Sequence, residues 1–257
     1  MFGARLTLFK LFGFAVRADM SWFIVVVLVI TSLSTEAFPR LYAGLTPIVY
    51  WLMGIVGAII LFLSIVTHEF AHALIARRYG IPMRGITLFV FGGVAEMDDE
   101  PPSAKAELLM SLAGPATSLL LGAVFLAGYA AAVFMNAPLS VAGVVGFIGS
   151  TNVMLALFNL IPAFPLDGGR VLRSLLWMRS GNVRRATRRA SQTGSALGLI
   201  LVFGGIVQAF TGNFIGGLWW FLIGMFIRNA ALMSYQQVVL REALQGEPVR
   251  RFMSPTR

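Results

Sequence analysis

The two histidines of this chain are four residues apart and enclose a glutamate, in the run His68-Glu69-Phe70-Ala71-His72. In a helix, residues i and i+4 lie on one face, so both imidazoles can reach one metal ion. The carboxylate of Glu69 beside them can accept a proton from a water molecule. This spacing therefore predicts a hydrolytic metal centre, although the same pattern also occurs by chance in unrelated helices.

A third metal ligand is expected, because a catalytic zinc ion usually has three protein ligands and one open position. The chain has no cysteine and no third histidine, so this ligand should be a carboxylate. Glu69 is better used as the general base, because the histidines near it already hold the metal. The other acids except Asp167 flank the first apolar segment or lie in a polar connection or the tail: Asp19, Glu36, Glu96, Asp98, Asp99, Glu100, Glu107, Glu242 and Glu247.

Asp167 remains as the third ligand of one Zn²⁺ per chain. It lies in Pro165-Leu166-Asp167-Gly168-Gly169, directly after an apolar segment. The prolines and glycines around it predict an irregular backbone. A plain turn is the alternative interpretation of this motif.

The elements that must position these side chains are strongly apolar. The chain has 257 residues, of which 58% are hydrophobic and 12% charged, whereas soluble domains have about 25% charged residues. A bilayer-spanning helix needs roughly 20 apolar residues. We therefore expect an α-helical polytopic membrane protein with about six transmembrane helices, near residues 20–35, 46–76, 106–135, 139–161, 195–211 and 214–235.

The formal charge of +9 comes from arginines that gather in alternate connections. Because cytoplasmic loops are enriched in Lys and Arg, this distribution predicts a multi-pass plasma-membrane protein with both termini in the cytoplasm. His68, His72 and Asp167 then fall at similar depth, toward the cytoplasmic side. The basic connection 173–189 is expected to be a solvated surface, and nucleic acid is not expected as a partner.

Residues 84–96 have a different composition, rich in β-branched and aromatic residues with paired glycines, which predicts strand and turn. The run Phe14-Ala15-Val16 could pair with it, giving a small membrane-associated β-sheet. Gly92 and Gly93 are candidate substrate-binding residues in this segment. A simple hairpin turn is the alternative.

Two motifs together resemble the site-2 protease family of intramembrane zinc metalloproteases. They are His68-Glu69-Phe70-Ala71-His72 in a second apolar segment and the pattern from Asn159 to Gly169 after a fourth. The resemblance implies that His68, His72 and Asp167 bind zinc and that Glu69 is the catalytic acid and base. It also implies that Asn159 helps to position substrate or to stabilise the transition state, although Asn159 could instead only hydrogen-bond at a helix end.

The resemblance adds expectations about organisation and partners. Residues 1–240 should form the six-span metalloprotease domain. Residues 241–257 look like a linker and the start of a CBS domain, through Met253-Ser254-Pro255, which suggests the family branch with such domains and an adenine nucleotide as a ligand. The family implies transmembrane protein substrates in the lipid bilayer, such as an anti-sigma factor or a membrane-tethered transcription factor, cleaved to send a signal.

Less specific alternatives remain for the residues and for the whole chain. Asn152, a candidate substrate-binding residue, could equally be a packing polar group. A zinc transporter would also have buried histidines and acids, but it gives no reason for a glutamate between them. A non-catalytic membrane scaffold is the third possibility, against which the intact Glu69 argues.

Overall fold

The computed structural model describes residues 5–11, 13–89, 92–97 and 101–244, and the chain divides into two units, Met1–Leu160 and Ile161–Arg257. Each unit is described by itself. Six helices are long and apolar enough to cross a membrane, as judged by length and composition. The predicted class, a polytopic α-helical membrane protein with a small sheet, is confirmed.

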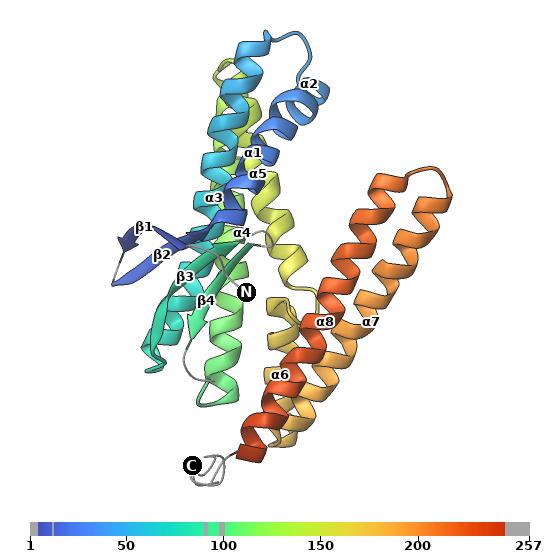
Figure 1. The fold of residues 1–257 in the computed structure, drawn as a ribbon. Helices are drawn as coiled ribbons and strands as arrows, with labels where there is room; N and C mark the ends of the chain where they lie inside the picture. The colour runs from blue at the N-terminus through green and yellow to red at the C-terminus, as the bar shows by residue number, and fades with distance from the viewer. Residues whose placement is uncertain (1–4, 12, 90–91, 98–100, 245–257) are drawn as a thin grey trace, which may run out of the picture. The chain divides into compact units, whose positions relative to one another are not determined.

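Four of these candidate spans belong to the first unit (Figure 1). Asp19 caps the first helix, since its side chain accepts a hydrogen bond from the Ser21 amide, and Ser103 caps α4 in the same way. The helices are α1 (Met20–Ser32), which continues through the π-helical turn η1 (Leu33–Ala37) into α2 (Phe38–Leu41), then α3 (Pro47–Arg78), α4 (Ala104–Phe134) and α5 (Leu139–Asn159).

Helix α3, which carries the two histidines, is longer than a bilayer requires. Its 32 residues extend about 48 Å at 1.5 Å per residue, against a hydrocarbon core of about 30 Å. His68 and His72 lie in the C-terminal third of this helix. Arg77 and Arg78 end it, where positive charge suits both the helix dipole and a membrane surface.

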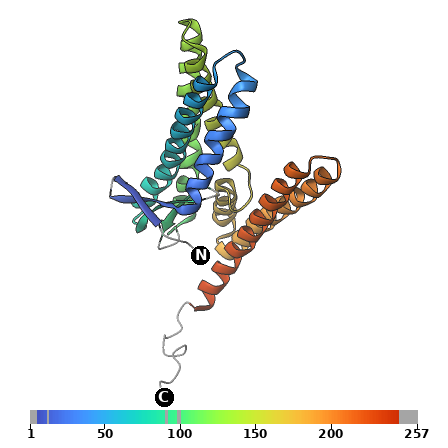
Figure 2. The same ribbon diagram turned by 45° about the horizontal axis from the view of Figure 1, so that its top comes forward.

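A four-stranded sheet in the order β1-β2-β3-β4 lies beside the C-terminal half of α3 (Figures 1 and 2). Its strands are β1 (Arg5–Leu11), β2 (Phe14–Asp19), β3 (Met83–Phe89) and β4 (Gly92–Met97). Strand β2 pairs in parallel with β3, with Ala15 opposite Gly85. The predicted pairing of the Phe14–Val16 run with the strand-and-turn segment is therefore confirmed.

The sheet packs on α3 through a buried apolar cluster that flanks the histidines. Val66, Phe70 and Ala73 of α3 pack with Phe14 and Val16 of β2 and with Ile86 and Leu88 of β3. The rings of Phe14 and Phe70 meet edge to face, with centroids 6.0 Å apart. Val66, Phe70 and Ala73 lie on the same turns of α3 as the two histidines. Their packing against the sheet therefore fixes the rotation of the helix about its axis.

The second unit contains α6 (Asp167–Ser180), α7 (Val183–Phe210) and α8 (Phe214–Leu244), of which α7 and α8 lie side by side in both ribbon views (Figures 1 and 2). Their backbones approach closely at glycines: a Cβ atom on Gly198 would lie 2.7 Å from the Gly224 carbonyl oxygen. Small residues permit such packing between membrane helices.

The basic connection 173–189 is helical except at residues 181–182, and α7 begins at Val183, which corrects the expectation of a fifth span that starts only near residue 195. Gly181 ends α6 in the left-handed conformation (φ 64°), and the Asn182 side chain caps α7 at the Arg185 amide. Arg173 also departs from the expected solvated surface, because it is buried and its guanidinium lies 5.5 Å from the Phe164 ring centroid.

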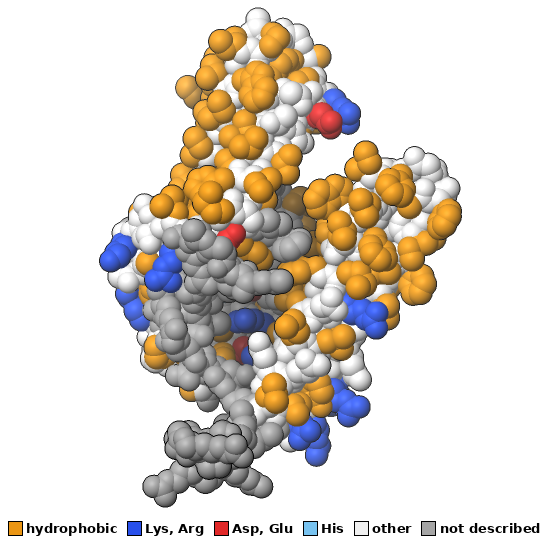
Figure 3. Space-filling model, viewed as in Figure 1, with side chains coloured by type: hydrophobic (Ala, Val, Ile, Leu, Met, Phe, Trp, Pro, Cys, Tyr) orange, Lys and Arg blue, Asp and Glu red, His pale blue; other side chains and the backbone are white. Residues whose placement is uncertain are grey.

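The space-filling view shows an apolar surface and a separate group of basic side chains (Figure 3). Hydrophobic side chains cover the visible faces of α7 and α8, and Lys and Arg side chains gather toward the end where α7 begins. In the first unit, exposed apolar side chains of α3 include Ile48, Leu52 and Ile59. Contiguous apolar surface of this extent fits a lipid environment.

Candidate metal centre

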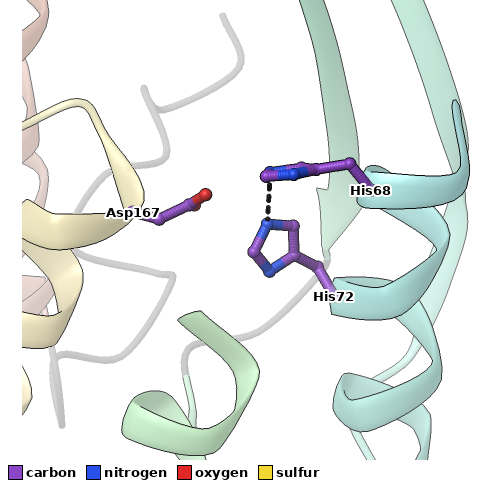
Figure 4. Close-up of side chains that lie close together, drawn as sticks. All are labelled: His68, His72 and Asp167. Carbon is purple, nitrogen blue, oxygen red and sulfur yellow. Dashed lines mark hydrogen bonds between the residues drawn. The ribbon is translucent and has the colours of Figure 1, made fainter. Parts of the chain in front are cut away.

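His68 and His72 face each other from successive turns of α3 (Figure 4). Their Nε2 atoms are 3.2 Å apart, and their ring centroids are 4.9 Å apart at an interplanar angle of 75°. His68 is buried, with 3% of its surface exposed, whereas His72 is half-buried. The helix therefore brings the two nitrogens together as the spacing predicts.

Helix α4 holds both rings through their other nitrogens. The Nδ1 atom of His72 lies 2.7 Å from the carbonyl oxygen of Met110, and Nδ1 of His68 lies 2.9 Å from the Ser118 hydroxyl oxygen. Hydrogen bonds of this kind fix the orientation of histidines that bind metal ions. They leave the two Nε2 atoms as the nitrogens directed to a shared ligand.

Gly114 provides the space in front of these nitrogens. A Cβ atom on Gly114 would lie 2.5 Å from His68 Nε2 and closer still to His72 Nε2. Any side chain there would therefore occupy the region where the imidazoles converge. The cradle, like the donor set of imidazole nitrogens, fits a zinc ion.

Met110, Gly114 and Ser118 were not among the predicted site residues. They lie on one face of α4 at intervals of four, and all three are buried. The sequence offers one signal near them, the glycine and proline of Gly114-Pro115 within an apolar helical segment.

Glu69 follows His68 directly and is half-buried on α3. Its role as acid and base stays a prediction.

The two asparagines of α5 occupy different settings. Asn152 is fully buried, and its amide nitrogen donates to the Ser64 hydroxyl at 3.1 Å and to the Ile148 carbonyl at 2.9 Å. Ser64 is one turn of α3 before His68, so this bond ties α5 to α3 near the metal centre, and it suits a packing role. Asn159 is half-buried and is the last residue of α5. Substrate binding by Asn152 and catalysis by Asn159 stay predictions.

Gly92 and Gly93 begin β4 and pair with Phe89 and Leu88 of β3. Within the described residues, β4 pairs only with β3 and is an edge of the sheet. Substrate binding at these glycines stays a prediction, as does the simple hairpin turn.

Asp167 belongs to the second unit and is labelled with the histidines in Figure 4. The irregular backbone predicted around it ends at Leu166, and Asp167 is the first residue of α6 rather than part of a turn. The positive end of the helix dipole favours an ionised carboxylate at that position. Gly169 is required behind it, since a Cβ there would lie 2.5 Å from the Ala163 carbonyl carbon.

Comparison with known proteins shows the family. Residues 56–137 and 131–204, together more than half of the chain, match the family described as Peptidase family M50. The chain therefore belongs to peptidase family M50. The matched stretch includes His68, His72 and Asp167.

Relatives agree with this membership. The chain is 36% identical over 245 residues to the "Putative zinc metalloprotease Rip3" of Mycobacterium tuberculosis, and the match covers 95% of this chain and 62% of that protein. It is also 36% identical over 239 residues to a Synechocystis protein named as a zinc metalloprotease, sll0528, with coverage of 92% and 61%. The chain thus spans about three fifths of the length of these relatives.

The solved site-2 protease from Methanocaldococcus jannaschii is similar in structure. It is 29% identical in sequence and superposes with a TM-score of 0.58, over 90% of this chain and 95% of that one. The predicted membership of the site-2 protease family is confirmed, and this family implies zinc as the metal. The predicted CBS segment lies largely outside the described residues, which end at Leu244.

Proposed function

We propose that this chain is the membrane domain of an intramembrane zinc metalloprotease, with His68, His72 and Asp167 as the ligands of one zinc ion. The observation behind the proposal is the pair of imidazoles held by α4 so that both Nε2 atoms converge in front of Gly114. Asp167, the proposed third ligand, supplies the carboxylate from the first residue of α6. Neither cysteine nor a third histidine is available to replace the carboxylate.

Zinc at this position would lower the pKa of a bound water to about 7 and polarise the scissile carbonyl. Glu69 then accepts the proton of the attacking water and delivers it to the nitrogen of the leaving amine. The Asn159 side-chain amide donates a hydrogen bond to the oxygen on which negative charge develops. These roles need a site that water can reach. We therefore also propose a polar path that connects the site with the cytoplasm.

The proposed substrates are transmembrane proteins, cleaved in or near the bilayer to send a signal. A helical segment must unwind before cleavage, because its carbonyl groups are engaged in the helix and shielded from attack. The edge strand β4, with Gly92 and Gly93 at its start, can pair with the unwound segment as an added strand. Anti-sigma factors and membrane-tethered transcription factors are substrates of this kind.

We further infer a plasma-membrane orientation with both termini and the zinc site toward the cytoplasm. Six candidate spans return the chain to its starting side. The arginines at the ends of α3 and α6 and at the beginning of α7 then lie on that side. An adenine nucleotide as a regulator stays a prediction, because it depends on the tail after Leu244.

Reconstitution in liposomes tests the function directly against the transporter alternative. The full-length protein is mixed with a single-span substrate, and both substrate cleavage and zinc flux into the lumen are followed. We expect cleavage without flux, complete loss of cleavage with 1,10-phenanthroline, and recovery on zinc addition. Zinc flux without cleavage of any offered substrate would favour the transporter.

A further inference from the structure

The backbone of Phe164 lies between two glycines that belong to different helices of the second unit. A Cβ atom on Gly169 of α6 would clash with the Phe164 amide nitrogen. A Cβ atom on Gly194 of α7 would clash with the Phe164 carbonyl oxygen and would lie 2.9 Å from the amide nitrogen. Only glycine lets two backbones approach so closely, so both helices must present a bare backbone to Phe164.

The side chain of Phe164 has contacts in the same helices. It is buried in an apolar cluster with Ala190 of α7 and Ala231 of α8. Leu172 of α6 packs against this cluster. The guanidinium of Arg173, which is also buried on α6, lies 5.5 Å from the ring centroid, within the range of a cation–π contact. The side chain therefore joins the loop before α6 to all three helices of the second unit.

A short stretch of backbone connects this anchored residue with Asp167, the first residue of α6. The Leu166 amide donates to the Ala163 carbonyl oxygen at 3.0 Å, and the Leu166 carbonyl oxygen accepts from the Gly169 amide at 3.0 Å. These bonds tie the loop to the first turn of the helix, so a displacement of the anchored residue also displaces that turn. A metal ligand must be held within about 0.5 Å of its productive place.

We propose that Gly194 and Phe164 are positioning residues for Asp167. Helix α7 holds the Phe164 backbone against Gly194, and the backbone held there sets the place of the Asp167 carboxylate within the second unit. Gly194 is the more informative of the two, because it lies on a different helix from Asp167. The inference rests on the proposed function, which makes Asp167 the third ligand of zinc.

The substitution Gly194→Ala tests the inference through zinc affinity. The full chain is purified in detergent, and its affinity is measured by competition with a chromophoric chelator. We expect the affinity to fall about 10–100-fold, the range found for residues that orient metal ligands without binding the metal. The absorption spectrum of the Co²⁺-substituted protein should also change, because it reports the coordination geometry. A loss of stability alone would leave that spectrum unchanged.

Gly198→Ala is the matched control, one turn further along α7. A Cβ atom on Gly198 would lie 2.7 Å from the Gly224 carbonyl oxygen and 2.8 Å from the Arg228 Cβ. The three atoms nearest to it all belong to α8, so this substitution strains the contact between α7 and α8 rather than the Phe164 backbone. We expect both variants to lower the melting temperature, but Gly198→Ala should bind zinc within about twofold of the unsubstituted protein.

A double-mutant cycle shows whether the effect of Gly194 passes through the carboxylate. If it does, Gly194→Ala should weaken zinc binding by less than about twofold in a chain that already carries Asp167→Ala. Phe164→Leu is an independent variant for the case that Gly194→Ala does not fold. It removes the ring beside Arg173, keeps an apolar side chain, and should weaken zinc binding by about tenfold.

The outcomes separate this inference from the proposed function. Equal zinc affinities of Gly194→Ala and Gly198→Ala would overturn it, as would an unchanged Co²⁺ spectrum in Gly194→Ala. An equal loss from Gly194→Ala with and without Asp167, or full affinity in Phe164→Leu, would overturn it too. If the unsubstituted protein binds no zinc, or if Asp167→Ala binds it equally well, the proposed zinc site fails instead.

Discussion

The Nε2 atoms of His68 and His72 lie 3.2 Å apart on one face of α3, within a helix apolar enough to span a membrane. Helix α4 holds both rings from behind, and the sheet packs against the neighbouring residues of α3. Two buried or half-buried imidazoles in such a helix are costly unless they have a function. Their arrangement supports the proposed zinc site.

The proposed third ligand can be tested by metal content. We expect Asp167→Ala to lower the zinc affinity at least about 100-fold, because a three-ligand site loses its one anionic donor. Glu36→Ala is a control that removes an exposed acid, 64% exposed and paired with Arg40 on the surface. Zinc stoichiometry near one per chain in Asp167→Ala, measured by inductively coupled plasma mass spectrometry, would remove Asp167 from the ligand set.

The space in front of the imidazoles predicts a severe effect from a single methyl group. Gly114→Ala should abolish zinc binding, since its Cβ would lie 2.5 Å from His68 Nε2. Gly128→Ala is the matched control on the same helix, where a Cβ would meet only Val145 at 3.5 Å, an ordinary contact. Isothermal titration with zinc distinguishes the two variants, and equal binding by both would contradict the described site.

The contact between the sheet and α3 predicts where stability resides in the first unit. Phe70→Ala should lower the free energy of unfolding by about 3–5 kcal/mol, the usual cost of truncating a buried phenylalanine. Phe158→Ala on α5, which is 49% exposed, should cost much less, because its ring faces lipid or detergent. Thermal denaturation of the two variants compares them, and similar melting temperatures would argue against the cluster around Phe14 and Phe70.

The proposed orientation can be measured by labelling single cysteines, because the chain has none of its own. Asn182→Cys lies between α6 and α7, and Asn213→Cys lies between α7 and α8. We expect a membrane-impermeant maleimide added to intact cells to label position 213 and not position 182. Labelling of position 182 alone would reverse the topology.

The sequence predicted those features that depend on local pattern. Apolar segment length predicted the six spans, helical spacing predicted the imidazole pair, and β-branched composition predicted the sheet. It missed the contacts of His68 with Ser118 and of His72 with Met110, which join residues 50 and 38 positions apart. No local pattern marks such contacts, because they depend on how α3 and α4 pack.

The beginning of α7 was missed for a different reason. Its first two turns are rich in arginine, so a search for apolar residues places the start near residue 195 instead of Val183. Arginine is nevertheless a good helix former. The sequence Ser180-Gly181-Asn182 contains the stop and start signals that would have located this boundary.

The most direct test of the central claim compares the unsubstituted protein with Glu69→Gln in liposomes that contain a single-span substrate. We predict that both proteins bind one zinc ion with similar affinity, and that the rate of peptide-bond cleavage falls at least about 100-fold in Glu69→Gln, as expected for loss of a general base. Mass spectrometry of the products should locate the cleaved bond in or next to the transmembrane segment. Cleavage by Glu69→Gln at the unsubstituted rate would contradict the account.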